Sequence, residues 1–306
     1  MATIVVVTFA LVHLAPGDAV DALAGGGGDE SYYRYLRSYL RLDRPALEQL
    51  LSYAGNLVQG DLGLSFVQGS RPVTDLIGER LPATLLLMAT ALGLSTAGGI
   101  LLGSLAARRP FGPLDLGIST AALVGYSVPA FWLGQLALMF LAFRTGLLPV
   151  QGMTDARADH TGLSHVLDVA RHLVLPALVL ATSELALITR VTRTGLLQQL
   201  GRDYVRTARA SGVAESRVVT RHALPNALLP VVTIIGHRIP LLLTITVAVE
   251  TVFGWPGLGT LLVTAAQTRD GPLLLGIVLL LAFSVVLANL VTDLVYAWID
   301  PRIRFD

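Results

Sequence analysis

Apolar residues are concentrated in five long segments separated by short polar connections. Neither Leu81–Ala107 nor Leu116–Phe143 contains a charged residue. The other three segments are Leu173–Thr189 (interrupted by Glu184), Ala223–Val249 (interrupted by His237-Arg238) and Pro272–Leu290. A helix needs about 20 apolar residues to cross the hydrocarbon core of a bilayer. The pattern therefore predicts five transmembrane helices in an all-α polytopic membrane protein.

A sixth apolar segment lies at the N-terminus, where Met1 to Ala15 is somewhat short for a full crossing. A signal peptide is also short and apolar, but it requires a positively charged start and a small-residue cleavage site. We favour a first transmembrane helix, which makes six, and expect the natural chain to begin upstream of Met1.

Residues 16–80 form the longest stretch between predicted transmembrane helices. Gly25 to Gly28 predict a flexible turn, and apolar residues recur at helical spacing in Tyr32–Leu42 and in Pro45–Val58. Two interpretations stay open for this tyrosine-rich pair of helices. It is either an interfacial cap on the helix bundle or a docking surface for an extracytoplasmic protein.

The distribution of arginine between the short loops predicts the orientation of the chain. Arg108 and Arg109, seven arginines from Arg190 to Arg221, and two near the C-terminus place eleven on one side, whereas four lie on the other. Positive charge in short loops favours the cytoplasmic side. Both termini are therefore expected in the cytoplasm, and residues 16–80 outside it. The four arginines of the outer side are Arg144, Arg157, Arg171 and Arg269.

Composition agrees with a membrane protein and excludes several kinds of chemistry. Hydrophobic residues make up 53% of the chain, charged residues only 14%, and the mean hydropathy is +0.66. All 22 basic residues are arginine. Without lysine the chain has neither a P-loop ATP site nor Schiff-base chemistry. Without cysteine it has no disulfide or thiolate metal site. We expect no enzymatic activity, no metal site and no cofactor in this chain.

The most informative segment runs from Arg202 to Gly212 and continues from His222 to Pro230. Its first part, Arg202-Asp-Tyr-Val-Arg-Thr-Ala-Arg-Ala-Ser-Gly212, predicts a helix over Asp203–Ala210 that ends at Gly212, a residue suited to a helix C-cap. A second short helix is expected over Ala214–Ala223. Two short helices joined at a glycine make a compact knob. The 200–223 loop is thus either a docking knob or a lipid-headgroup anchor built from the same arginines.

This segment resembles the coupling loop, or EAA region, of the membrane subunits of binding-protein-dependent ABC importers. Gly212, Leu224, Pro225 and Ala208 match the general pattern, whereas Arg206 stands where glutamate is usual. Within that family, the sequence of this segment is most similar to that of the dipeptide and oligopeptide permeases. Other strings similar to that family are Leu14-Ala-Pro-Gly-Asp18, Gly60-Asp-Leu-Gly63, Arg80-Leu-Pro-Ala-Thr84, Val128-Pro-Ala-Phe-Trp-Leu-Gly134, Glu250-Thr-Val-Phe-Gly-Trp-Pro-Gly-Leu-Gly259 and Asp300-Pro-Arg-Ile-Arg304.

The resemblance implies a permease subunit in a bacterial cytoplasmic membrane. It is organised as a first helix in residues 1–15, an extracytoplasmic region in 16–80 and a core permease domain in 81–306. The implied partners are a second homologous permease, two cytoplasmic ATPase subunits that bind ATP-Mg, and an extracytoplasmic substrate-binding protein. Residues expected to couple to the ATPase are Arg202, Asp203, Tyr204, Arg206, Thr207, Ala208, Arg209, Ala210, Gly212, Leu224 and Pro225.

The expected cargo is a peptide, and a nickel chelate, haem or another small solute stays open as an alternative. A secondary transporter is a different class, which would predict inverted repeats; none is visible in the sequence.

One ionisable pair falls near the middle of a predicted transmembrane helix. Arg238, beside His237, lies about 21 Å along a helix from Leu224 at 1.5 Å per residue. Pro240 is expected to kink this helix. Charged groups at this depth face a cavity or pair with one another, and Glu184 and Glu250 are candidate partners. Two roles stay open, a structural ion pair and a contact with substrate.

Overall fold

The computed structural model describes residues 2–14, 29–39, 43–65, 67–155, 157–158 and 161–299. Within this range the chain is helical apart from one two-stranded antiparallel ribbon. The chain divides into two compact units, the first comprising Met1–Thr84 with Pro256–Val286 and the second Leu85–Trp255 with Leu287–Asp306. The expected turn at Gly25–Gly28 and the string Asp300–Arg304 lie outside the described residues.

The elements follow one another as a series of long helices separated by short ones. The early elements are α1 (Ala2–Leu14), α3 (Glu30–Tyr39), α4 (Ala46–Val58), β1 (Leu64–Ser65) and β2 (Arg71–Pro72). The central elements are α5 (Val73–Arg108), α6 (Pro113–Ser127), α7 (Ala130–Ala137), the π-helix η1 (Leu138–Phe143) and α8 (Leu163–Leu200). The last are α9 (Asp203–Ala210), α10 (Glu215–Arg217), the π-helix η2 (Val218–Ala223), α11 (Leu224–Ala227), α12 (Leu229–Phe253), α13 (Leu258–Gln267) and α14 (Gly271–Ile299).

Four helices among the described residues are long and apolar enough to cross a membrane: α5, α8, α12 and the Gly271–Thr292 part of α14. A fifth candidate is a bent pair, in which Pro113–Ser127 and Ala130–Phe143 meet at 103°. The span expected over Leu116–Phe143 therefore corresponds to a bent pair of helices rather than to one continuous helix. The break falls at Val128-Pro129, where the proline ring disfavours helical geometry in the preceding residue, and Val128 is extended with ψ 126°.

Two further expectations about helices can be compared with the structure. Helix α12 continues through Pro240 without interruption, so this proline does not end the helix. Helix α1 has 13 residues, fewer than a complete crossing needs.

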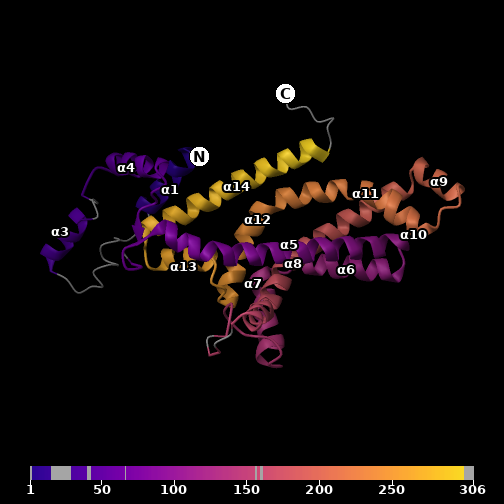
Figure 1. The fold of residues 1–306 in the computed structure, drawn as a ribbon, viewed down its shortest axis with the longest axis horizontal. Coiled ribbons are helices and arrows are strands. Elements are labelled where there is room, and N and C mark those ends of the chain that lie inside the picture. The colour runs from indigo at the N-terminus through magenta and orange to yellow at the C-terminus, as the bar shows by residue number, and fades with distance from the viewer. Residues whose placement is uncertain are drawn as a thin grey trace. The chain divides into compact units, whose positions relative to one another are not determined.

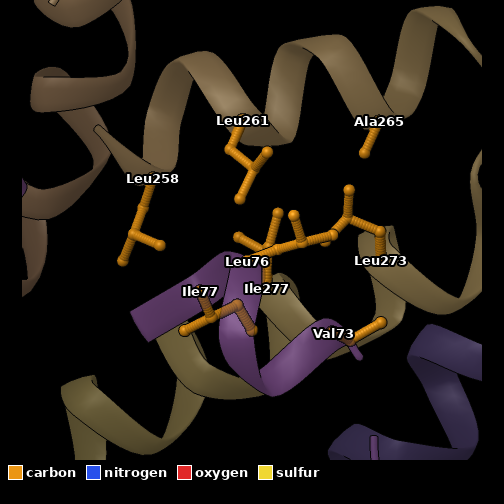
Figure 2. Close-up of a cluster of buried hydrophobic side chains, with 8 residues drawn as sticks. All are labelled: Val73, Leu76, Ile77, Leu258, Leu261, Ala265, Leu273 and Ile277. Atoms are coloured by element: carbon orange, nitrogen blue, oxygen red, sulfur yellow. The ribbon is translucent and has the colours of Figure 1, made fainter. Parts of the chain in front are cut away.

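The first unit is held by a cluster of buried apolar side chains (Figure 2). Leu76 and Ile77 of α5 pack against Leu258 of α13 and Ile277 of α14. Between these helices, Gly276 allows a close approach, since a Cβ at that position would lie 2.5 Å from the side chain of Val73. The cluster comprises Val73, Leu76, Ile77, Leu258, Leu261, Ala265, Leu273 and Ile277.

A buried carboxylate joins the β-ribbon to the start of α14 within this unit. Asp270 is 3% exposed, and its side chain accepts hydrogen bonds from the hydroxyl of Ser65 and, at 3.3 Å, from the backbone N–H of Leu273. Burial raises the pKa of Asp270 above its ordinary value, while these two donors oppose the shift. The carboxylate therefore caps α14 and fixes β1 to it at the same time.

Replacing Asp270 with alanine is expected to destabilise the first unit by about 1–3 kcal/mol, because the N–H of Leu273 and the hydroxyl of Ser65 lose their buried acceptor. Thermal unfolding of the detergent-solubilised chain measures this loss. Ser65→Ala, which removes one donor and leaves the cap, should cost less. Equal melting temperatures for Asp270→Ala and the unchanged chain would contradict the prediction.

In the second unit, α6 lies along α8 (Figure 1) and α5 meets α8 through glycine. A Cβ at Gly99 would lie 2.6 Å from Ile188, and one at Gly103 would lie 2.6 Å from the backbone carbonyl of Thr189. Small residues four apart let two helix backbones approach closely in a bilayer, where packing contributes much of the association. The Gly99–Gly103 pair therefore sets the separation of α5 and α8.

Candidate functional site

The 200–223 loop begins where α8 ends. Helix α8 has 38 residues, so at 1.5 Å per residue it extends about 57 Å, whereas a bilayer with its headgroups is about 40–45 Å thick. Helix α5 has 36 residues and extends about 54 Å. At a modest tilt, a helix of this length extends beyond the headgroups at one end or at both. The 200–223 loop continues from the C-terminal end of α8.

Helix α9 occupies Asp203–Ala210, which confirms the helix expected there. It ends in a Schellman motif around Gly212, whose φ is +76°. The N–H of Gly212 donates to the carbonyl of Arg209 at 3.0 Å, and the N–H of Val213 donates to that of Ala208 at 3.2 Å. Glycine adopts this left-handed backbone without the steric cost that other residues incur. The glycine therefore fixes the direction of the turn between α9 and α10.

The second helix of the loop differs in type from the expected one. Instead of one α-helix over Ala214–Ala223, a single turn of α10 continues into the π-helix η2. Figure 1 shows α9 and α10 side by side beyond α11. Their shared core contains Val205 of α9, Val218 of η2 and Leu196 of α8, all fully buried. The loop is thus a compact part of the second unit, continuous with a candidate membrane span.

Two ion pairs lie on the surface of the loop. Arg206 meets Asp203 at 3.2 Å, and the guanidinium of Arg209 binds Glu215 through two hydrogen bonds of 2.7 and 3.0 Å. Hydrogen bonding to Arg209 lowers the pKa of Glu215. The second pair connects α9 with α10 across the Gly212 turn, so it holds the two helices of the loop in one orientation.

The other residues expected to act in coupling lie around the same turn. The phenol of Tyr204 donates to Gln199 at 2.9 Å and accepts from Asn226 at 3.3 Å, which connects α9 with α8 and α11. Thr207 bonds back to the carbonyl of Asp203 at 3.0 Å. Other expected coupling residues on or next to these helices are Arg202, Ala208, Ala210, Leu224 and Pro225. Ala208 and Leu224 pack against the buried core of the loop, whereas Arg202, Ala210 and Pro225 are exposed.

A cleft of about 620 Å³ lies at the base of the loop. Its apolar lining comes from α8 and η2 and includes Leu196, Leu200 and Val219. Polar groups at the cleft include Arg108 at the end of α5 and the Arg209–Glu215 pair. This cleft is not visible in the sequence, because it depends on how three separate segments pack.

One of the two acidic partners expected for Arg238 meets it in the structure. Arg238 of α12 donates to Glu184 of α8 through three hydrogen bonds of 2.8 to 3.1 Å. Glu184 is 2% exposed and Arg238 20% exposed. This assigns Arg238 to Glu184; Glu250, the other candidate, is fully buried further along α12, and His237 is exposed. The geometry is that of an ion pair joining two candidate membrane spans.

A second buried ion pair was not anticipated. Asp115 of α6 binds Arg193 of α8 at 2.5 and 2.6 Å and also accepts the N–H of Phe111 at 2.8 Å. The guanidinium carbon of Arg193 lies over the ring of Phe111, 5.9 Å from its centroid. In the sequence Arg193 was counted with loop arginines, although α8 continues to Leu200. Asp115 directly precedes Leu116, where a predicted transmembrane segment begins, and its charge at that position is the sequence feature that could have indicated the pair.

Comparison with known proteins places this architecture among transport proteins. The family model described as "Binding-protein-dependent transport system inner membrane component" matches residues 99–305. The oligopeptide transport system permease protein AppB of Bacillus subtilis is 39% identical over 99% of this chain and 94% of its own length. The dipeptide transport system permease protein DppB of Escherichia coli K12 is 41% identical over 98% of this chain and 94% of its own length.

Solved structures share the fold at lower sequence identity. A chain of the inward-facing MetNI methionine ABC transporter superposes with a TM-score of 0.60 at 18% identity, covering 76% of this chain and 99% of that one. At this identity the likeness shows the fold alone. The sequence relatives and the family model together show that the chain belongs to the family of binding-protein-dependent transport system inner membrane components.

Proposed function

We propose that this chain is the membrane-spanning permease subunit of an ATP-driven importer of dipeptides or oligopeptides. Its near full-length similarity to a dipeptide and an oligopeptide permease supports this cargo. The observation that carries the mechanism is the compact 200–223 loop, which follows a helix longer than a bilayer is thick. Such a loop is suited to pass a rigid-body displacement of an attached protein into the spans.

The proposed assembly contains a second homologous permease, two cytoplasmic ATPase subunits or domains, and an extracytoplasmic substrate-binding protein. ATP-Mg binds to the ATPase, since this chain has no lysine with which to build a P-loop. In this proposal the chain crosses the membrane six times with both termini in the cytoplasm, and residues 16–80 lie outside. The two permeases together enclose the pathway for the peptide.

Each part of the loop has a defined role in this proposal. The exposed face of α9 contacts the ATPase. The Gly212 turn and the Arg209–Glu215 pair keep α9 and α10 rigid with respect to each other. The buried contact of Val205 with α8 transmits the displacement. Closure of the ATPases on ATP then shifts α8 and so changes access to the pathway.

Gly212→Val is expected to lower the ratio of peptide uptake to ATP hydrolysis by at least about tenfold. A β-branched residue resists a φ of +76°, so the Schellman turn would have to rearrange. Uptake of a labelled dipeptide into proteoliposomes holding the whole complex, measured beside ATPase rate, tests this. Membrane insertion of the chain should be unchanged.

Gly212→Asn provides the matched control. No atom lies within 4 Å of a Cβ built on Gly212, so space is not limiting, and asparagine tolerates the left-handed region. It should retain most of the coupling. If Gly212→Val transports peptide at the normal ratio of uptake to hydrolysis, the coupling role of the loop is rejected.

A further inference from the structure

The 200–223 loop carries more positive charge than its own acids neutralise. Asp203 pairs with Arg206 and Glu215 with Arg209. Within the part of the chain that the structure describes, Arg202, Arg217 and Arg221 are exposed and form no ion pair. The loop therefore presents an excess of three positive charges to whatever binds it.

The length of α8 favours a protein over a lipid as the source of the opposite charge. A headgroup anchor would keep the arginines at the depth of the phosphates. A helix of about 57 Å cannot end at headgroup depth on both sides of a membrane about 40–45 Å thick unless it is strongly tilted. The charges also lie beyond the end of this helix, on α10, η2 and the connection before α9. A soluble partner is within reach of all three.

The cleft, whose lining includes Gly201 and Ser216 next to Arg202 and Arg217 in the chain, specifies a second property of the partner. Its lining of Leu196, Leu197, Leu200, Val219 and Ala107 is apolar, and its volume of about 620 Å³ is large enough for one or two bulky side chains. An apolar hollow next to surface charges is the usual arrangement of an interface, in which an anchor side chain fills a pocket and charged groups surround it.

On these grounds we infer that the ATPase surface that docks here is an acidic groove that also supplies an apolar anchor for the cleft. The inference rests on the proposed function, and it adds the chemistry of the partner. Carboxylates of the ATPase meet Arg202, Arg217 and Arg221, and an aromatic or aliphatic side chain enters between α8 and η2. The charges steer docking and set its register, whereas the anchor contributes most of the affinity.

The inference predicts strongly salt-dependent docking. The permease pair in nanodiscs of phosphatidylcholine is titrated with the purified ATPase subunits that co-purify with it, at about 50 mM and about 300 mM NaCl, because exposed charge pairs are screened over this range. Replacing Arg202, Arg217 and Arg221 together with glutamine should weaken binding at low salt about tenfold. The same triple replacement with glutamate should weaken it further.

Ser216→Trp tests the cleft, since Ser216 lies at its exposed rim outside the buried core. A tryptophan there should occupy the hollow and weaken binding about tenfold at both salt concentrations. The matched control is Arg157→Glu, an exposed arginine in the connection before α8, which should leave ATPase binding unchanged. Normal elution of each variant from gel filtration shows that it is folded.

A compensating change supplies the direct evidence for contact. Acids of the ATPase that cross-link to the loop are replaced with arginine, and this should restore binding of the triple glutamate variant. Salt-independent binding with unchanged affinity of the triple variants would overturn the inference and leave the proposed function intact. If the triple variants bind the ATPase more weakly only in nanodiscs that contain acidic lipids, the arginines would be assigned to lipid headgroups. Failure of every ATPase preparation to bind the unchanged chain would reject both.

Discussion

Glu184→Ala is expected to prevent the chain from assembling into a stable complex. The substitution leaves Arg238 with no partner for three hydrogen bonds, and a guanidinium cannot lose its proton to escape the cost. Removing one partner of a buried pair destabilises a protein by about 3–5 kcal/mol. Thermal unfolding in detergent and the yield of complex on gel filtration measure this effect.

Neutralising both partners distinguishes the cost of an unpaired charge from the cost of lost side-chain packing. Glu184→Gln with Arg238→Gln keeps two side chains able to hydrogen-bond across the same interface and should recover most of the stability. Glu48→Ala serves as the matched control, since its ion pair with Arg44 is more than half exposed and contributes little. Normal assembly of Glu184→Ala, or failure of the double variant to recover, would show that the pair does not carry the stability.

The same variants address the two roles left open for Arg238. A purely structural pair predicts that the double glutamine variant both assembles and transports normally. A contact with substrate predicts that it assembles but transports poorly, because the positive group that meets a peptide carboxylate is gone. The uptake rate of the assembled double variant therefore distinguishes the two roles.

Gly103→Ala is expected to have the second largest effect, although it adds only a methyl group. That carbon would lie 2.6 Å from the carbonyl oxygen of Thr189, 2.7 Å from Cβ of Thr192 and 3.0 Å from the backbone nitrogen of Arg193. A side chain can change rotamer, but a helix backbone cannot, so α5 and α8 must separate. Overpacking of this kind costs about 1–3 kcal/mol. The melting temperature in detergent should fall accordingly.

Gly93 provides the control on the same helix. No atom lies within 4 Å of a Cβ at Gly93, so Gly93→Ala should be neutral or stabilise the chain by up to about 1 kcal/mol through helix propensity. Opposite signs for the two glycine-to-alanine changes would establish the close approach of α5 and α8. A stable Gly103→Ala variant would show that these helices can move apart without cost.

The sequence alone determined the parts of this protein that depend on local composition. Four of the predicted apolar runs correspond to helices long enough to cross a membrane, because a bilayer cannot hydrogen-bond an open backbone and so favours helix in any such run. The bounds of α9 were also predicted as observed, and Gly212 was identified as its C-terminal turn, because both depend only on residues that are neighbours in the sequence. The coupling resemblance also rested on this contiguous segment.

Tertiary structure decided what depends on which distant residues meet. Nothing in the spacing distinguished Glu184 from Glu250 as the partner of Arg238, since both are acids in apolar helices, and only the packing of α12 on α8 selected Glu184. The Asp115–Arg193 pair joins positions 78 apart in the chain. The cleft between α5, α8 and η2 likewise follows from side-chain packing over long sequence separations, which hydrophobic periodicity does not encode.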